Sequence, residues 1–210
     1  MALVRATKRS ASAQAPSEQL SCSSLADLAV QLRSDEPAQR RQAARDLALT
    51  SEGIPILCEH LEHEPAVSVR SVIMTSLIQS RSRAAVEGLA RYLRSENTAL
   101  RNEAIEALQD MPEQIAPYME RLLSDPESDV RIFAVNILSV LPDARAPEWL
   151  RKVILEDAHV NVCAAAVDCL AEIGTPDSIA ALKQLRLRFG DHPFMIFAID
   201  AAIRRIGGSQ

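Results

Sequence analysis

One short pattern of apolar and polar positions recurs six times along the chain. The copies read QRRQAARDL, VRSVIMTSL, LRNEAIEAL, VRIFAVNIL, VCAAAVDCL and FMIFAIDAA. The second residue of each copy, which we call the repeat position, is Arg40, Arg70, Arg101, Arg131, Cys163 or Met195, at steps of 30 to 32 residues. Residues one before and three, four and seven after this position lie on one helical face and are mostly apolar or small. Each copy therefore predicts an amphipathic helix.

A second amphipathic segment precedes each copy. These segments read LADLAVQL, IPILCEHL, AAVEGLARYL, QIAPYMERLL, PEWLRKVIL and SIAALKQL. Most prolines stand where a helix starts, because the missing N–H costs nothing there, whereas Pro55 and Pro117 fall inside first-helix segments, where we expect kinks. The pattern predicts two antiparallel helices per unit, in units covering about residues 24–49, 52–80, 83–111, 113–141, 146–173 and 175–208.

One helix pair of this size cannot bury its apolar stripe alone, so neighbouring pairs must stack into a continuous core. Composition favours helices, because 48% of residues are hydrophobic, only 3% are aromatic and glycine appears six times. No run of alternating β-branched and aromatic residues indicates a half-buried strand. We expect an all-α fold with residues 21–210 as a single repeat domain.

Two segments resemble the HEAT repeat superfamily, and within it the short repeats of the phycobilisome-lyase type. They are CLAEIGTPDSIAALKQL, at residues 169–185, and the acidic loop and helix SDPESDVRIFAVNIL. The resemblance covers about residues 24–208 and implies a right-handed α-solenoid of about six antiparallel helix pairs. It says little about function, since such arrays serve many unrelated tasks.

The resemblance also implies a ladder of arginines that joins neighbouring units. Its members would be Arg40, Arg70, Arg101 and Arg131, with loop acids Glu64 and Asp125. The spacing predicts that Glu64 pairs with Arg70 and Asp125 with Arg131, because one planar guanidinium fork satisfies several acceptors. Where Cys163 and Met195 replace arginine, we expect the ladder to lapse and apolar contact alone to hold the last units.

The N-terminal residues 1–20 form a segment apart from the repeats. They are small and polar, with three basic residues against one acid, Glu18, and predict a flexible tail. An organelle transit peptide and a tail that orders on a partner are the alternatives. The four cysteines, Cys22, Cys58, Cys163 and Cys169, form no C-x-x-C pair, so we expect reduced thiols.

The overall charge gives no field suited to a polyanion, because 23 basic residues face 28 acidic ones for a formal net charge of −5. We therefore expect no nucleic-acid partner. DNA glycosylases with HEAT-like repeats also use aromatic residues on a basic concave face, whereas the only tryptophan here, Trp149, lies in a first helix that we expect to face outward. No segment reaches the length of a membrane span, so we expect a cytoplasmic protein without a membrane partner.

Enzymatic signatures are scarce. The densest cluster is CEHLEHE, with Cys58, His60, His63 and Glu64. Its side chains could be metal ligands. The interpretation we favour is a solvated helix face on which residues four apart pair with one another. HEAT-like di-iron hydroxylases use several His-Glu dipeptides, and this chain has one. We expect no catalytic residue, no metal and no cofactor, and so a protein that is not an enzyme.

The candidate binding surface lies on the second helices, which usually line the concave side of such arrays. It comprises Ile132, Phe133, Asn136, Asp168, Ile196, Phe197 and Asp200. On one interpretation these residues form a hydrophobic groove with an acidic edge for an amphipathic or extended segment that carries a basic residue. On the other, Phe133 and Phe197 turn inward between adjacent helices and Ile132 and Ile196 are the exposed residues. The last helix is unusually apolar for a terminal unit, which indicates a cap, such as a second copy, or a binding site.

The sequence thus favours a non-catalytic protein-protein interaction module, an adaptor or assembly factor that binds a partner protein on its concave face. The alternative is a bilin-lyase-like or other cofactor-handling accessory protein that acts with a partner subunit. A third hypothesis is a purely structural role through end-to-end contacts.

Overall fold

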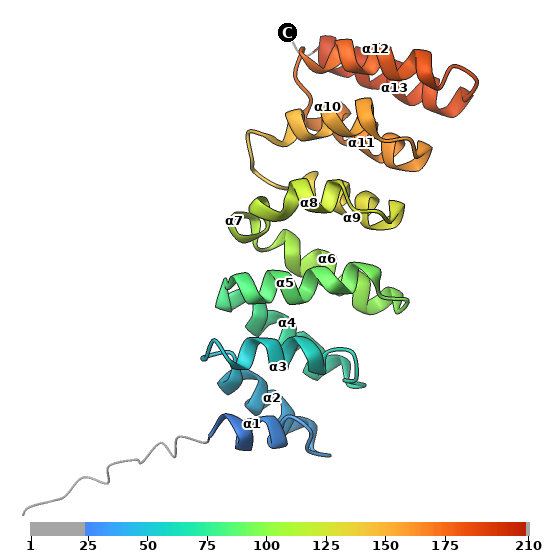
Figure 1. The fold of residues 1–210 in the computed structure, drawn as a ribbon. Helices are drawn as coiled ribbons and strands as arrows, with labels where there is room; N and C mark the ends of the chain where they lie inside the picture. The colour runs from blue at the N-terminus through green and yellow to red at the C-terminus, as the bar shows by residue number, and fades with distance from the viewer. Residues whose placement is uncertain (1–23, 209–210) are drawn as a thin grey trace, which may run out of the picture.

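The computed structural model describes residues 24–208, so the predicted tail at residues 1–20 and Cys22 lie outside the described part of the chain. Within residues 24–208 the secondary structure is entirely helical. The all-α solenoid of stacked helix pairs is confirmed, and the pairs follow one another from α1 at one end to α13 at the other (Figure 1).

Each unit contains a first helix and a second helix. The first three pairs are α1 (Leu25–Gln31) with α2 (Pro37–Leu47), α3 (Gly53–His60) with α4 (Val67–Ser80), and α5 (Arg83–Arg91), extended by the 3-10 turn η1 (Tyr92–Arg94), with α6 (Thr98–Gln109). In the fourth unit α7 (Pro112–Ile115), the 3-10 turn η2 (Ala116–Tyr118) and α8 (Met119–Leu123) precede α9 (Ser128–Leu138). The last two pairs are α10 (Ala146–Glu156) with α11 (Val160–Ile173), and α12 (Ser178–Arg188) with α13 (Pro193–Gly207).

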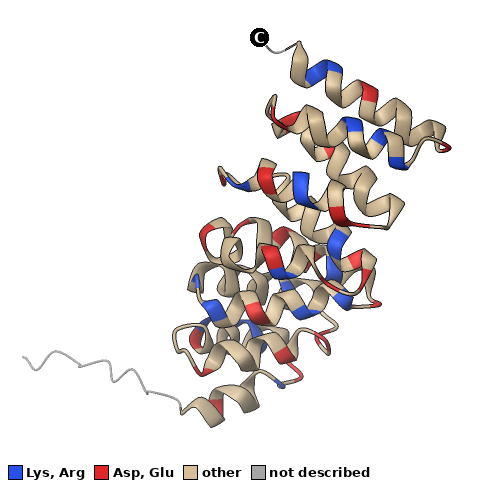
Figure 2. Cartoon of the chain, turned by 45° about the horizontal axis from the view of Figure 1, so that its top comes forward, with Lys and Arg blue, Asp and Glu red and all other residues tan. Residues whose placement is uncertain are grey.

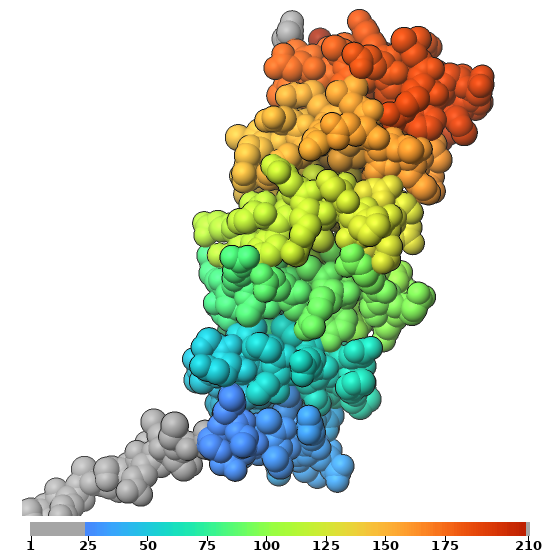
Figure 3. Space-filling model, in the orientation of Figure 1, coloured from blue at the N-terminus to red at the C-terminus, as the bar shows by residue number. Residues whose placement is uncertain are grey.

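The units pack in two layers. First helices lie against first helices, as α3 does against α5 and α10 against α12, while α11 lies between α9 and α13 in the layer of second helices. The space-filling view shows each unit in continuous contact with the next (Figure 3). Lys and Arg are intermixed with Asp and Glu along the array (Figure 2).

The apolar stripe of the repeat forms the core. In α9 and α11 the residues one before and three, four and seven after the repeat position are all buried: Val130, Ala134, Val135 and Leu138, and Val162, Ala166, Val167 and Leu170. The stripe changes in the last unit, where Phe194 precedes the repeat position and is 71% exposed. No further helix pair covers α13 within the described residues.

Two prolines behave differently from one another. Pro117 interrupts the first helix of the fourth unit, which breaks into α7, η2 and α8. The kink expected at Pro55 is wrong, because α3 begins at Gly53 and places Pro55 in the first turn, where its missing N–H has no helical acceptor to lose.

Trp149 lies on a first helix, α10, as the sequence pattern predicts. Its side chain is buried, with 6% exposed, and its indole N–H donates to a carboxylate oxygen of Glu120 on α8 at 3.2 Å. The ring therefore packs between two consecutive first helices, with the Arg145 guanidinium 4.5 Å from its centroid.

None of the helices within residues 24–208 combines the length and apolar content needed to cross a bilayer.

The three described cysteines give a direct test of the core. Cys58, Cys163 and Cys169 are free thiols and buried, and burial is the main cause that raises the pKa of Cys58 and of Cys169 to about 11. We expect a Cys22→Ser variant to react with a thiol reagent at pH 8 only after denaturant is added, because reactivity requires an exposed thiolate. Rapid labelling of the native variant would contradict this packing.

Candidate functional site

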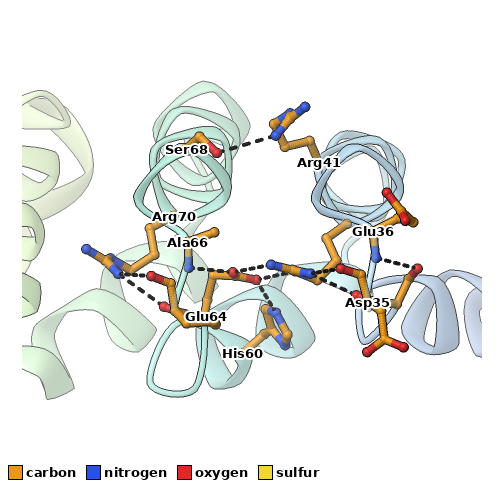
Figure 4. Close-up of polar contacts among 11 residues, drawn as sticks. Asp35, Glu36, Arg41, His60, Glu64, Ala66, Ser68 and Arg70 are labelled. Carbon is orange, nitrogen blue, oxygen red and sulfur yellow. Dashed lines mark hydrogen bonds and ion pairs between the residues drawn. The ribbon is translucent and has the colours of Figure 1, made fainter.

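Arg40 and Glu64 join the first two units through a buried ion pair. Arg40 Nε and Nη2 each donate to a different Glu64 oxygen, both at 2.8 Å, and the Glu64 side chain is fully buried. The same carboxylate accepts from the Ala66 N–H at 2.9 Å, and His60 Nε2 lies 2.9 Å from Oε2 (Figure 4). Burial alone would raise the pKa of Glu64, but the hydrogen bonds from Arg40, Ala66 and His60 outweigh it and hold this pKa below its usual value.

The four repeat-position arginines share one backbone contact. In each, Nη1 donates to the carbonyl oxygen six residues earlier, at distances between 2.7 and 3.1 Å. The acceptors are the carbonyls of Ser34, Glu64, Ser95 and Asp125 for Arg40, Arg70, Arg101 and Arg131 respectively. The guanidinium thus fixes each second helix to its own preceding loop.

The predicted side-chain pairing of Glu64 with Arg70 is wrong. Arg70 reaches only the main-chain oxygen of Glu64 and directs Nε and Nη2 to the two Glu103 oxygens of the next unit, at 3.2 and 3.3 Å. The Glu64 carbonyl oxygen thus accepts from Arg70 of its own unit, while its carboxylate binds Arg40 of the preceding unit.

The predicted pairing of Asp125 with Arg131 is wrong for the same reason. Arg131 Nη1 donates to the Asp125 carbonyl oxygen. Its other two nitrogens donate to the Asp157 carboxylate of the next unit, Nε to Oδ2 at 2.6 Å and Nη2 to Oδ1 at 3.1 Å. The Asp125 carboxylate binds Arg94, at the end of the preceding first helix. Arg94 was not singled out from the sequence, since it lies outside the repeated motif.

Arg101 differs from the other three because no carboxylate from residues 24–208 pairs with its guanidinium. Its Nε is buried without a hydrogen-bond partner, and its guanidinium carbon lies 5.3 Å from the centroid of the Phe133 ring. Phe133 follows its repeat position by two residues, as Glu103 does in the unit before. The aromatic face therefore occupies the place over Arg101 that the Glu103 carboxylate occupies over Arg70.

The lapse of the ladder expected at Cys163 is wrong. Arg188, from the end of α12, reaches back to the carbonyl oxygens of Leu155 and Asp157 at 2.8 and 2.7 Å and donates to Cys163 Sγ at 3.1 Å. Cys163 Sγ donates to the Asp157 carbonyl oxygen at 3.3 Å, and the Arg188 guanidinium from the following first helix supplies the further donors that Cys163 lacks.

The two phenylalanines of the candidate surface lie in different surroundings. Phe133 is half-buried against Arg101, whereas Phe197 is 67% exposed. The repeat position of the unit before Phe197 is Cys163, which has no guanidinium to lie against the ring as Arg101 lies against Phe133. Phe133 fits the interpretation that the ring turns inward, and Phe197 does not.

The isoleucines and polar residues complete this surface. Ile132 and Ile196 are both half-buried, and Ile132 packs against the core, so the greater exposure expected for them over Phe197 is wrong. Asn136 and Asp168 are exposed, and Asp200 forms an ion pair with Arg186 at 2.9 Å. Phe194 lies on the same helix as Phe197. The repeat pattern predicts that Phe194 belongs to the buried stripe, but its side chain is exposed.

Asp168 is the one acid of this surface for which no ion pair or hydrogen bond is found among the described residues. Desolvation raises its pKa above the ordinary value, because neighbouring apolar side chains of the second-helix layer displace water from it. A cation placed beside Asp168 would stabilise the charged carboxylate and so offset the free energy lost by its desolvation.

The CEHLEHE cluster does not converge on a metal site. His60 and Glu64 meet as an i,i+4 pair, but Glu64 is taken by Arg40 and Ala66, and Cys58 is buried beneath α5. Within residues 24–208 no group of three or more His, Cys, Asp or Glu side chains has an arrangement that could hold a metal ion.

A pocket of about 320 Å³ lies between the fourth and fifth units on the first-helix side. Trp149 and Val153 line it together with Glu120, Glu156 and Lys152. Its charges are mixed: Arg131 and Asp157 of the lining form an ion pair, and Glu120 accepts a hydrogen bond from the Trp149 indole. It adds polar surface to the first-helix side of the array.

Comparison with known proteins agrees with the repeat pattern. Residues 115–191 match the family model for HEAT repeats, which confirms the resemblance over that part of the chain. No curated protein matches the chain.

Several solved structures are similar to the chain at low identity. A designed armadillo repeat protein in complex with a (KR)4 peptide is 20% identical with a TM-score of 0.43, over 88% of this chain and 100% of that chain. An engineered protein is 21% identical with a TM-score of 0.43, over 89% and 100%. The complex of CpcE and CpcF of phycocyanin lyase from Nostoc sp. is 18% identical with a TM-score of 0.36, over 92% and 98%.

Proposed function

We propose that this helical-repeat array is a non-catalytic protein-protein interaction module, an adaptor or assembly factor that holds a partner on the second-helix surface of its last three units. The observation that carries the proposal is the exposure of two phenylalanines on α13, 71% for Phe194 and 67% for Phe197. Large aromatic side chains are the residues that contribute most at protein interfaces, and adjacent exposed ones favour a contact surface.

The half-buried isoleucines extend this surface along the array. Ile132 on α9 and Ile196 on α13 flank α11, whose equivalent residue is the small Ala164. A shallow apolar strip between two larger residues suits the apolar face of a partner helix or an extended segment.

Asp168 supports a partner that carries a basic residue. Its carboxylate has no cation partner among the described residues and is partly desolvated, so a lysine or arginine brought to it would form a charge-assisted contact. Asp200 contributes less to this preference, because Arg186 already pairs with it.

The test compares two matched pairs of substitutions in the full chain. Phe197→Ser with Asp168→Lys removes an aromatic anchor and reverses the unpaired charge, whereas Leu49→Ser with Asp110→Lys makes the same changes at exposed positions outside the surface. Proteins crosslinked to the chain in extract of the source cells are identified, and the affinity of the purified partner is then measured for each variant.

We expect the first double variant to weaken partner binding by about 100-fold or more, equivalent to about 2.7 kcal/mol, since one interface aromatic and one charge contact are lost together. The control should bind within about threefold of the wild type. Equal binding by both variants would refute this location for the interface.

A second copy of the chain is the other occupant to examine. Sedimentation equilibrium of the wild type and of Phe194→Ser with Phe197→Ser measures it directly. If the wild type dimerises and the double variant does not, the surface serves self-association, and the adaptor function fails unless partner binding competes with the dimer.

A further inference from the structure

Three arginines converge on a pocket on the opposite, first-helix side of the array. The pocket has a volume of about 450 Å³ and lies where α4 ends, α5 begins and the interrupted first helix of the fourth unit passes. Arg81 follows α4, Arg83 opens α5, and Arg121 belongs to α8, so the three come from separate elements. The break at Pro117, which lines the pocket, separates α7 from α8 at this place.

Tyr118 forms the buried wall of this pocket. It is 7% exposed, its hydroxyl donates to Glu87 Oε1 at 3.0 Å, and the guanidinium carbons of Arg83 and Arg121 lie 5.6 and 5.1 Å from its ring centroid. The ring thus fixes two of the three arginines by cation–π contact.

The charges of the pocket are incompletely neutralised from within the chain. Glu87 pairs with Arg83 at 3.1 Å, while for Arg81 and Arg121 no carboxylate partner is found among residues 24–208. Glu113 is the one acid in the lining, and it forms no ion pair with them there. The guanidinium groups of Arg81 and Arg121 therefore line the pocket without a carboxylate hydrogen bond among the described residues, and the charge of Arg121 is only partly offset by an electrostatic interaction with Glu87.

Arg81 occupies this place at a backbone cost. It is the only described non-glycine residue with positive φ, at φ 44° and ψ 31°, a left-handed conformation that costs a side-chain-bearing residue about 1 kcal/mol. Glycine would relieve that cost, so the arginine contributes through its side chain rather than through the turn.

We propose that this pocket binds a phosphate group, which Arg81 and Arg121 grip from two sides. A carboxylate has two oxygens and fills one guanidinium fork, whereas a phosphate monoester presents three free oxygens and carries close to two negative charges near pH 7. Two unpaired forks match the phosphate, and the half-buried Gln114 amide adds a further donor at the pocket wall. This site is independent of the second-helix surface.

The experiment titrates the full chain with inorganic phosphate at pH 7.5 and constant ionic strength, by calorimetry, with acetate as the comparison anion. Arg81→Gly removes one fork and at the same time relieves the backbone, so it tests binding in a protein at least as stable as the wild type. Glu113→Gln removes the opposing acid, and Arg33→Gln, at an exposed arginine near α1, is the matched control.

We expect Arg81→Gly to weaken phosphate binding by about tenfold or more, Glu113→Gln to strengthen it by about threefold, and Arg33→Gln to leave it unchanged. Acetate should bind much more weakly than phosphate. Binding should also weaken as the pH falls from 7.5 to 5.5, because phosphate then loses its second charge while the arginines keep theirs.

A phosphoserine peptide and its unphosphorylated form identify the source of the group. Tighter binding of the phosphopeptide than of inorganic phosphate supports a phosphorylated chain as the ligand, and equal binding supports a free phosphate. The proposal is overturned if Arg81→Gly retains wild-type affinity, or if acetate binds as tightly as phosphate.

Discussion

Replacing Glu64 with glutamine should lower the free energy of unfolding by about 3 kcal/mol, the largest effect expected of a polar substitution in this chain. The change leaves the shape of the side chain but removes the charge that neutralises Arg40, which is only 8% exposed. A buried guanidinium without a counter-ion must then bear its desolvation cost.

Glu103→Gln is the matched control, because the Glu103 carboxylate pairs with Arg70 as the Glu64 carboxylate pairs with Arg40. That pair is more open to solvent, with side-chain exposures of 15% and 29%, and its distances are longer. We expect a loss of at most about 1 kcal/mol there. Urea denaturation measures the free energy of unfolding of each variant. Hydrogen exchange shows whether Glu64→Gln lowers amide protection in α2 and α4, the helices next to the ion pair.

The effect of Glu64→Gln should depend on pH in a defined direction. Because folding lowers the pKa of Glu64, the stabilisation from its ionised form is complete above the unfolded value of about 4.3 and is lost as the pH falls through the lower folded value. The difference between wild type and variant should therefore be constant near neutral pH and shrink below about pH 4. A difference that grows toward acid would contradict the ion pair as its cause.

Gly88→Ala should destabilise the chain by about 2 to 3 kcal/mol, although alanine favours a helix. A Cβ atom at this position would lie 2.3 Å from Cys58 Sγ and 2.8 Å from Cys58 Cβ. Both residues are on first helices that pack directly, α5 and α3. The added methyl group therefore forces the two helices apart and disturbs the packing between units two and three.

Two further substitutions separate this clash from helix propensity. Gly207→Ala adds the same methyl group at a place with no neighbour within 4 Å, and we expect it to be neutral or to stabilise by up to about 1 kcal/mol. Adding Cys58→Ala to Gly88→Ala removes the closest contact and should recover part of the lost stability, as thermal unfolding would show. If Gly88→Ala and Gly207→Ala behave alike, the close approach of α3 and α5 is refuted.

The helical period and the buried stripe could be predicted from the amino-acid pattern alone. Spacing of one, three, four and seven residues about the repeat position places Val130, Ala134 and Leu138 on one face whatever packs on it, because helix geometry alone fixes that face. The same periodicity predicts the all-α solenoid. Phe194 is the apolar stripe residue that is exposed, and it lies in the last unit, beyond which no further helix pair is described.

The partner of each arginine depends on how the units stack and could not be predicted from the sequence. Arg40 binds Glu64, 24 positions away, and Arg70 binds Glu103, 33 positions away, so the partner is chosen by how neighbouring units stack and not by spacing within a unit. The same reason explains why Phe133 is covered by Arg101 while Phe197, which follows Cys163, is exposed. It also explains why Arg81 and Arg121, 40 positions apart in the sequence, line one pocket: helical periodicity fixes the direction of a side chain, and the docking of one unit on the next fixes what it touches.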